Sequence, residues 1–287
     1  MPSVLGEIIN LKDLTTLKVG GPGEVWEVAS LKDLKEATQE PYRIIGAGSN
    51  LLISDAGVKE RVIKLGSSFN SLKHFQGQSS VWLGAATPLP GLVRRAQHMG
   101  LSGLEGLLGI PAVLGGAIAM NAGTRFGEMS DSLKEVEVFI ENKLERLSVS
   151  ELKLSYRQSE LPKHAIITRA KLELKPSSPE TVQTLLDQVD AARKSQPKSK
   201  SAGCAFKNPL GQSAGKLIDD AGLKGLRVGD AMVSLEHGNF IINLGCATAS
   251  DVLKLCNLIL EKLNSPLKIE WQLWGFNSTE ILVQRGF

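Results

Sequence analysis

The stretch from Gly103 to Gly123 reads GLEGLLGIPAVLGGAIAMNAG and holds six glycines, one proline and a single charged residue. It follows neither the 3.6-residue period of an amphipathic helix nor the alternation of a half-buried strand. Glycines at this density let a backbone turn tightly and approach a bound group, because no Cβ stands in the way. Backbone N–H groups gathered in such turns form a cavity that suits phosphate oxygens. The stretch therefore predicts either a phosphate-binding turn or a buried, glycine-rich segment of the core.

The few polar residues of the stretch indicate how it could bind a ligand. Asn121 and Glu105 are its only strongly polar side chains, and both are candidates for hydrogen bonds to a bound group. A membrane span is disfavoured, because the uncharged part from Gly106 to Met120 is shorter than the ~20 residues of a spanning helix and Pro111 interrupts it.

A second glycine turn, GAGSNLLIS (Gly46 to Ser54), follows a predicted strand over Tyr42 to Ile45. It begins like a dinucleotide fingerprint, but Leu51 stands where the third glycine belongs and no helix pattern follows. We therefore predict a phosphate-binding turn rather than a Rossmann fold. A plain hairpin turn is the alternative.

Composition favours an ordinary globular enzyme. The chain has 287 residues, enough for about two domains, with 42% hydrophobic and 22% charged residues. A net charge of +3 is too small to indicate a nucleic-acid partner. The three cysteines show no metal-ligand spacing and favour a reducing compartment without disulfides. No signal-peptide pattern opens the sequence, so we expect a cytoplasmic protein. We expect no metal site, because no zinc-ligand spacing occurs.

Cys204 is the cysteine with a chemical context. It lies in GCAFKNP (Gly203 to Pro209), close to Lys207 and to a basic loop, RKSQPKSKSAG (Arg193 to Gly203). Positive surroundings lower the pKa of a thiol from about 8.5. The alternative for any free cysteine is a small buried hydrophobic side chain. Cys246 and Cys256 fit that alternative better, and Cys256 lies on the apolar face of a predicted helix.

Two further residues have both a functional and an ordinary interpretation. Arg157, next to Tyr156 in a connection, is either an anion clamp or a solvated surface arginine. Glu270, in a predicted strand over Leu267 to Leu273, would have a raised pKa if it were buried among its large apolar neighbours. On an edge strand it would face solvent instead.

Periodicity and capping signals place the other elements. Ser30 is a helix cap, and Ser177 with Glu180 forms a capping-box pattern with Pro179 in the first turn. The expected helices are 32–38, 88–98, 214–221 and 251–263, and the expected strands are 25–29, 62–65, 81–83, 136–140, 146–148, 166–174, 232–235 and 240–244.

Taken in order, several stretches resemble one family, the UDP-N-acetylenolpyruvoylglucosamine reductases. Each is modest alone, but the ordered set is specific and spans nearly the whole chain. The matching pieces are LKVGG (17–21), IGAGSNLLISDAGV (45–58), the stretch 103–123, SYRQS (155–159), SAGCAFKNP (201–209), AGKLIDDAGLKG (214–225), EHGNFIIN (236–243) and LKIEW (267–271).

The resemblance implies an α+β fold, with a two-lobed FAD-binding region of the vanillyl-alcohol-oxidase type and a C-terminal α+β substrate-binding domain. The length of the chain resembles that of the family's shorter subtype. The implied division is 1–65 with 266–287 as FAD-binding lobe 1, 66–195 as lobe 2 and 196–265 as the substrate-binding domain. The residues implied to bind FAD are Gly46, Ala47, Gly48, Ser49, Asn50, Leu51, Gly109, Ile110, Pro111, Gly115, Gly116, Ala117, Asn121, Ala122 and Gly123.

The resemblance also implies the chemistry. Cys204 matches the family's proton donor, where serine is commoner, and Arg157 and Glu270 match its other catalytic residues. Lys194, Lys207, Asn208 and Tyr156 match substrate contacts. Two positions depart from the family: Gln272 replaces an arginine that contacts a substrate anion, and Gly238 replaces an alanine, which we expect to be a small change.

The implied reaction is the reduction of an enolpyruvyl UDP-sugar by NADPH through FAD, in peptidoglycan synthesis and hence in cell-wall biogenesis. The implied partners are that UDP-sugar and NADPH, with no nucleic acid and no membrane, and the implied state is a monomer. Two alternatives stay open. One is another flavoprotein oxidase or dehydrogenase of the same fold, and the other is a nucleotide-binding protein without enzymatic activity.

Overall fold

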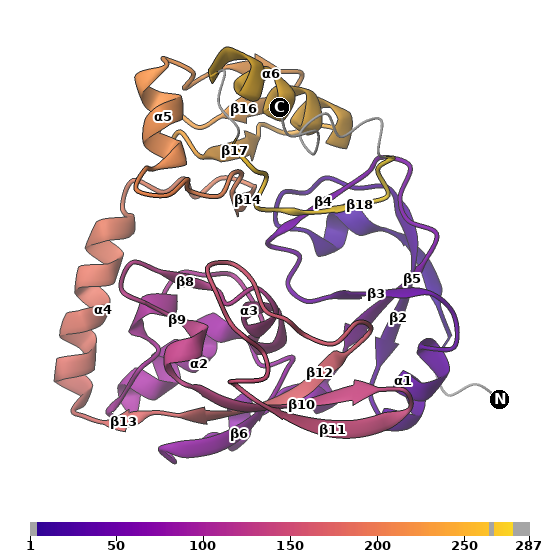
Figure 1. Ribbon diagram of the computed structural model, residues 1–287, viewed down its shortest axis with the longest axis vertical. Helices are drawn as coiled ribbons and strands as arrows, with labels where there is room; N and C mark the ends of the chain where they lie inside the picture. The colour runs from indigo at the N-terminus through magenta and orange to yellow at the C-terminus, as the bar shows by residue number, and fades with distance from the viewer. Residues whose placement is uncertain (1–4, 264–266, 278–287) are drawn as a thin grey trace. The chain divides into compact units, whose positions relative to one another are not determined.

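The computed structural model describes residues 5–263 and 267–277, and its chain divides into two compact units (Figure 1). The chain passes from one unit to the other inside the first glycine turn, between Ala47 and Gly48. The three-part division implied by the family resemblance stays a prediction. Unit 1 comprises Met1–Gly6, Trp26–Ala47 and Val62–Lys194, and unit 2 comprises Glu7–Val25, Gly48–Arg61 and Ser195–Phe287.

One sheet has the strand order β1-β2-β5-β3. In unit 1 it consists of β3 (Tyr42–Ile45), β5 (Arg61–Leu65) and the second half of β2 (Pro22–Val28), whereas β1 (Glu7–Asn10) pairs with the first half of β2 in unit 2. Helix α1 (Leu31–Ala37) begins after Ser30, whose Oγ accepts the amide of Asp33 at 3.2 Å as the sequence predicted. The core beneath this sheet contains Trp26, Val28, Leu34, Ala37, Ile63, Phe139 and Ile166.

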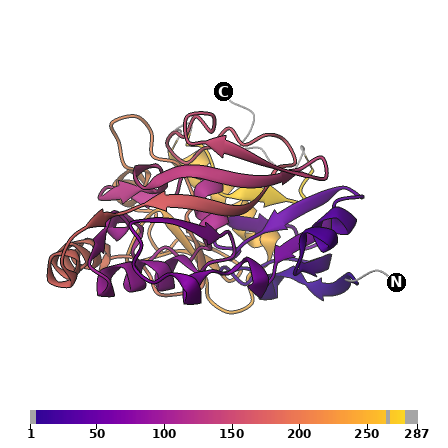
Figure 2. The same ribbon diagram turned by 90° about the horizontal axis from the view of Figure 1, so that it is seen from below.

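A second, antiparallel sheet in unit 1 has the order β11-β10-β12-β6, with long central strands β10 (Leu133–Ile140) and β12 (Ile166–Glu173). Figure 2 shows its strands and the helices of the unit in separate layers. The apolar face of α2 (Leu89–His98) packs against the sheet, because Leu, Val and Ala recur on one side of that helix. Its buried core includes Leu83, Leu92, Val136, Val138 and Leu172.

Unit 2 contains a four-stranded antiparallel sheet, β14-β17-β16-β15, covered by helices α5 (Ala214–Asp220) and α6 (Ala249–Leu263). A parallel pair of strands accompanies it: β18 (Gln272–Trp274), late in the chain, pairs with β4 (Leu51–Ile53), which directly follows the first glycine turn. The segment that contains Glu270 thus returns to the turn within the same unit.

Two expectations about local structure were wrong. Helix α4 (Pro179–Arg193) is capped by Ser178, whose Oγ accepts the amide of Thr181 at 3.1 Å, and not by Ser177. The expected late strand is also interrupted: a single bridge joins Phe206 to Ile269, and the strand proper begins at Gln272. The other described elements are α3 (Leu114–Ala119), β6 (Ser80–Gly84), β7 (Leu101–Ser102), β8 (Gly123–Thr124), β9 (Gly127–Glu128), β11 (Lys143–Ser148), β13 (Lys175–Pro176), β14 (Ser201–Cys204), β15 (Arg227–Val228), β16 (Ala231–Val233) and β17 (Phe240–Asn243).

The mixture of antiparallel sheets with packed helices confirms the expected α+β class. Across residues 5–263 and 267–277, no helix is both long enough and apolar enough to cross a membrane.

Candidate active site

Cys204 ends strand β14 at an irregularity in the pairing. The register between β14 and β17 shifts between Ser201 and Cys204, so that one extra residue bulges from β14 at this point. Gly203 adopts φ +74° within the bulge, a conformation that favours glycine. Bulges re-aim the side chain that follows them, and the half-buried Cys204 is that side chain.

Glu270 lies on the strand segment next to Cys204. Its amide donates to the carbonyl of Ala205 at 2.8 Å, and the amide of Lys207 donates to the carbonyl of Lys268 at 2.8 Å. Residues 205–207 and 268–270 therefore run side by side, which brings the half-buried Glu270 next to the residue that follows Cys204. Two of the three predicted catalytic residues, Cys204 and Glu270, thus lie on neighbouring segments of unit 2.

The first glycine turn reaches the same place. The Nδ2 of Asn50 donates to the carbonyl of Glu270 at 3.4 Å, and the carbonyl of Asn50 accepts the amide of Gln272 at 3.0 Å. Gln272 itself pairs with Leu51 and is exposed. The residue that replaces the family's arginine therefore lies two positions from Glu270, at the start of β18.

The geometry of this turn fits a bound diphosphate. Gly48 adopts φ +63°, and a Cβ there would overlap the carbonyl oxygen of Leu14. Within the described residues, the amides of Ala47, Gly48 and Ser49 donate no hydrogen bond to the protein, although Gly48 is buried. Buried amides are almost always paired, so the buried Gly48 amide, between two half-buried neighbours that also have no protein acceptor, suits an anionic ligand.

The two glycine stretches touch within unit 1. A Cβ at Gly46 would lie 2.9 Å from Cγ2 of Val113 and 3.9 Å from Cα of Gly116. Gly116 is exposed and its Cβ position is open, so a ligand can approach the backbone there. The predicted FAD-binding residues of the second stretch lie in the loop 109–111, in α3 (Gly115, Gly116 and Ala117) and in the turn 121–123.

The polar side chains of the second stretch hold the loop itself. Asn121 is buried at φ +43°, where its Nδ2 donates to the carbonyl of Ser155 at 3.2 Å and its Oδ1 accepts the amide of Ser130 at 3.0 Å. Glu105 accepts the amide of Gly103 at 2.8 Å through one carboxylate oxygen. These bonds use one N–H and one oxygen lone pair of the Asn121 amide within the protein. The expectation that Asn121 and Glu105 bind a ligand stays a prediction.

Arg157 lies in a strained turn of unit 1. Its φ is +54°, unusual for a residue with a Cβ, and such strain is frequent at functional sites. The guanidinium lies 5.0 Å from the ring centre of Tyr156, and its Nη2 donates to the carbonyl of Gly123 at 2.6 Å. Arg157 is thus anchored to the end of the second glycine stretch, whereas Tyr156 is 47% exposed.

The predicted substrate contacts occupy accessible positions. Lys194 caps the C-terminus of α4 in unit 1 and is exposed. Lys207 and Asn208 follow Cys204 in unit 2, where the Oδ1 of Asn208 accepts the amide of Ala214 at 3.0 Å, at the start of α5. Lys194 thus lies in unit 1, whereas Lys207 and Asn208 lie in unit 2. The substrate roles of all three stay predictions.

The other two cysteines differ from each other. Cys256 is buried in α6 as expected, and burial raises the pKa of its thiol to about 12. Cys246 is exposed, so the expectation of a buried side chain was wrong there. It lies in the β17–α6 connection, where its amide donates to Asp230 at 2.9 Å.

Two contacts near the site escaped the sequence analysis. Arg193 donates through Nη2 to the carbonyl of Gly109 at 3.1 Å, which fixes the predicted cofactor loop. Thr16 donates through Oγ1 to the carbonyl of Ser201 at 2.6 Å, at the start of the Cys204 strand. Neither residue carries a local signal, because each acts on a segment far away in the sequence.

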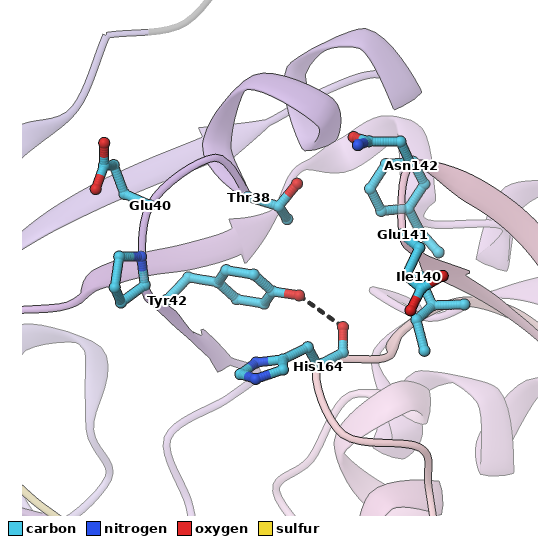
Figure 3. Close-up of a pocket in the computed structure, with 9 residues that line it drawn as sticks. Thr38, Glu40, Tyr42, Ile140, Glu141, Asn142 and His164 are labelled. Atoms are coloured by element: carbon cyan, nitrogen blue, oxygen red, sulfur yellow. Dashed lines mark hydrogen bonds between the residues drawn. The ribbon is translucent and has the colours of Figure 1, made fainter.

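A hollow of about 320 Å³ in unit 1 involves no predicted site residue (Figure 3). There the hydroxyl of Tyr42 donates to the carbonyl of His164 at 2.6 Å, and burial raises the pKa of that hydroxyl. Among the described residues, no group of three or more histidines, cysteines or carboxylates is arranged to hold a metal ion.

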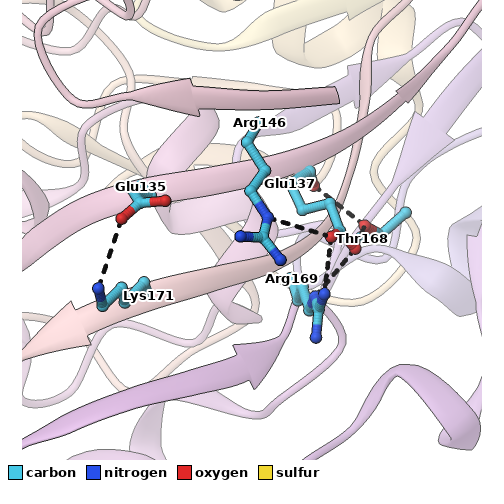
Figure 4. Close-up of polar contacts among 6 residues, drawn as sticks. All are labelled: Glu135, Glu137, Arg146, Thr168, Arg169 and Lys171. Carbon is cyan, nitrogen blue, oxygen red and sulfur yellow. Dashed lines mark hydrogen bonds and ion pairs between the residues drawn. The ribbon is translucent and has the colours of Figure 1, made fainter. Parts of the chain in front are cut away.

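An ion-pair network lies on the second sheet of unit 1 (Figure 4). The carboxylate of Glu137 accepts Nε and Nη2 of Arg169 at 2.9 and 2.7 Å, and Nε of Arg146 lies 3.7 Å away. Both guanidinium groups lie about 5 Å from the ring of Trp82. The hydrogen bonds from Arg169 lower the pKa of Glu137, so the network is structural and fully charged at neutral pH.

Comparison with known proteins agrees with this geometry. The C-terminal domain of UDP-N-acetylenolpyruvoylglucosamine reductases matches residues 196–273, and an FAD binding domain matches residues 19–142. The reductase of Thermus thermophilus is 57% identical over 93% of this chain and 98% of its own length. That of Deinococcus radiodurans is 49% identical over 93% and 95%.

A solved structure adds the fold. The crystal structure of UDP-N-acetylenolpyruvylglucosamine reductase from Thermus caldophilus matches with a TM-score of 0.90 and 56% identity, over 94% of this chain and 99% of that one. Identity above one half over nearly complete chains, together with the matched fold, shows that this chain belongs to the UDP-N-acetylenolpyruvoylglucosamine reductases.

Proposed function

We propose that this chain uses NADPH and FAD to reduce the enolpyruvyl ether of UDP-N-acetylglucosamine to UDP-N-acetylmuramate, a step of peptidoglycan synthesis. Family membership supports the reaction and both cofactors. The observation that carries the assignment of the site is the pairing of residues 205–207 with 268–270, which brings Cys204 and Glu270 together beside Asn50.

The chain's own residues would hold FAD at the two glycine stretches. The three amides of Ala47 to Ser49, which have no acceptor among the described residues, suit its diphosphate, and Gly116 leaves room for close approach. The flavin, when bound, passes on the hydride that NADPH supplies. The protein provides placement and electrostatics.

Cys204 is the proposed proton donor. Hydride addition to the terminal alkene carbon of the substrate leaves negative charge on the side that bears the carboxylate, and the adjacent carbon then gains a proton on one face. A thiol is intrinsically a stronger acid than a serine hydroxyl, which the family resemblance implies as the commoner residue at this position. The proton goes from Sγ to that carbon, and solvent restores the thiol.

Arg157 and Glu270 are the proposed stabilisers of the developing charge. A guanidinium pairs with a carboxylate through two parallel hydrogen bonds, and a protonated Glu270 can donate one more. Lys194, Lys207, Asn208 and Tyr156 are the proposed contacts to the UDP-sugar. We also propose that the enzyme acts as a monomer in the cytoplasm, without a nucleic-acid or membrane partner.

An anaerobic flavin titration tests the function. Protein reduced with one equivalent of NADPH receives the enolpyruvyl UDP-sugar while the flavin absorbance is followed. Reoxidation by that substrate in the absence of oxygen is the expected result. A flavin that stays reduced until oxygen enters would support the alternative flavoprotein oxidase, and a protein that takes up no FAD would support the non-enzymatic alternative.

Single-turnover kinetics of Cys204→Ala test the proton donor. We expect flavin reduction by NADPH within about threefold of the unmodified enzyme. Reoxidation by substrate should slow by roughly 10²–10⁴-fold, the usual contribution of general acid catalysis. Cys204→Ser should keep substantial activity, and Cys246→Ala, which removes an exposed thiol, is the matched control. Normal reoxidation by Cys204→Ala would remove Cys204 from this role.

A further inference from the structure

Asn239 is a buried asparagine, 2% exposed, whose four hydrogen-bonding groups are all used within unit 2. Its side chain forms two bonds with one residue: Oδ1 accepts the amide of Phe206 at 2.9 Å, and Nδ2 donates to the carbonyl of Phe206 at 2.8 Å. Its backbone carbonyl accepts the amide of Ala205 at 2.8 Å, and its amide donates to Nδ1 of His237 at 3.1 Å.

The side chain of Asn239 replaces a missing stretch of strand. β17 begins only at Phe240, and the chain before it turns away, with the amide of Phe240 donating to the carbonyl of His237 at 3.0 Å. The β17 backbone therefore ends short of Phe206 on that side. The amide group of Asn239 supplies the donor and the acceptor that a paired strand residue would have supplied, and Phe206 is 1% exposed, so water does not replace them.

The segment that Asn239 holds has Glu270 on its other side. The N–H and C=O of Phe206 and the amide of Ala205 bond to Asn239, while the carbonyl of Ala205 and the amide of Lys207 bond to residues 268–270. Residues 205–207, which follow the end of β14, are thus held by Asn239 on one side and by the segment that carries Glu270 on the other.

We propose that Asn239 is a positioning residue for the reduction. By fixing Phe206 it sets the register in which the Cys204 thiol meets the substrate. The inference rests on the proposed role of Cys204. A misplacement of about 1 Å at a reacting group costs up to roughly 100-fold in rate, so removal of this clamp should slow the step that needs Cys204.

Asn239→Leu keeps the approximate size of the side chain and removes both hydrogen bonds. Asn239→Asp is a milder second variant, because it keeps the acceptor for the Phe206 amide. The matched control is Asn243→Leu: Asn243 is 5% exposed at the other end of β17, and its Nδ2 bonds the carbonyls of Leu17 and Lys18 rather than the Cys204 strand.

The first measurement is hydrogen exchange on the whole protein without substrate. In Asn239→Leu the amides of residues 205–207 and of Glu270 should exchange at least tenfold faster than in the unmodified chain. Asn239→Asp should lie between the two. Asn243→Leu should leave these amides within about threefold of the unmodified rate.

The second measurement separates the half-reactions. Asn239→Leu should reduce its flavin with NADPH within about threefold of the normal rate and reoxidise it with the enolpyruvyl UDP-sugar about 10- to 100-fold more slowly. In a Cys204→Ala background the same substitution should add less than threefold, since the group it positions is gone.

The outcomes distinguish the two proposals. If Cys204→Ala is slow while Asn239→Leu reoxidises normally, or if Asn239→Leu and Asn243→Leu slow equally, the positioning role is wrong and the proton donor stands. If Asn239→Leu slows reoxidation equally with and without Cys204, Asn239 does not act through Cys204. Normal reoxidation by Cys204→Ala overturns the proton donor and this inference with it.

Discussion

At the scale of single residues, the three thiols of the chain show how environment assigns chemistry. Burial raises the pKa of Cys256 to about 12, which makes it unreactive, and Cys246 lies exposed in a connection between elements. Cys204 is half-buried at a strand bulge, beside the segment that carries Glu270. A thiol in that place keeps access to a ligand while its direction is fixed by the strand.

Glu137 permits a prediction about pH. Its folded-state pKa is lowered chiefly by the hydrogen bonds from Arg169, so its contribution to stability is complete above the unfolded pKa near 4.3 and is lost as the pH falls through the lower folded value. Glu137→Gln should lower the unfolding free energy by about 1.5–3 kcal/mol at pH 7, the range for hydrogen bonds to charged groups. The difference from the unmodified chain should shrink below about pH 4.

Urea denaturation at pH 7 and at pH 3 measures this effect. Glu145→Gln is the control, since Glu145 is exposed on the neighbouring strand β11. A Glu137→Gln penalty that is the same at both pH values would contradict the prediction.

Among the elements, helix α5 packs unusually closely on the turn before β17. A Cβ at Gly238 would lie 2.5 Å from the carbonyl oxygen of Gly215 in α5. We therefore expect the difference between glycine and alanine at position 238 to affect the packing of α5, although only one methyl group separates the two side chains.

Restoring the alanine should be unfavourable in this chain. Gly238→Ala requires α5 or the turn to shift, and we expect a loss of about 1–3 kcal/mol in unfolding free energy, as for other overpacked sites. Gly245→Ala is the matched control, because its Cβ would meet nothing nearer than Asp230 Oδ2 at 3.6 Å. Equal denaturation midpoints for the two variants would show that α5 yields without cost.

The elements also show what a sequence pattern can and cannot predict. The Ser30 cap and the helix over 88–98 follow from local signals, and both predictions were correct. The late strand was predicted as one piece because its composition is uniform. Its partners change within it: 268–270 pair with 205–207, whereas 272–274 pair with 51–53. The two pairings join segments 63 and 221 residues apart, counted from 205 to 268 and from 51 to 272, and such distant pairing has no local signature.

The candidate site divides in the same way. Cys204, Arg157 and Glu270 were candidates from the residues alone, each with an ordinary alternative, and only the family resemblance implied a catalytic role for them. None has a pattern that distinguishes it from an ordinary residue of its type. Asn239 was missed because its sequence pattern is that of any polar residue before a predicted strand, and nothing local indicates that its side chain is buried. The protein partners of Asn121, Ser130 and Ser155, were not predicted because they lie elsewhere in the chain.

For the whole molecule, cofactor and stability are linked. A ligand that binds only the folded protein stabilises it by about 2.7 kcal/mol at 100 times its dissociation constant. The thermal midpoint of the apoprotein should therefore rise with added FAD. Gly48→Ala should weaken this rise, because its Cβ overlaps the carbonyl of Leu14 and distorts the turn that offers the three amides.

Thermal unfolding over a series of FAD concentrations measures the effect. Gly211→Ala is the control, since Gly211 also has a positive φ of +71° but its Cβ would have no neighbour within 4 Å. If both variants respond to FAD as the unmodified protein does, the first glycine turn does not bind the cofactor.

The parallel pairing of β4 with β18 has a consequence for folding of the chain during its synthesis on the ribosome. Leu51–Ile53 is made early, yet its partner Gln272–Trp274 follows 221 residues later, counted from one strand to the other. At roughly 5–20 residues per second, the nascent β4 waits about 10–40 s before its partner is synthesised. During that interval the apolar strand β4 has no partner strand, and we expect a chaperone to bind the growing chain at β4.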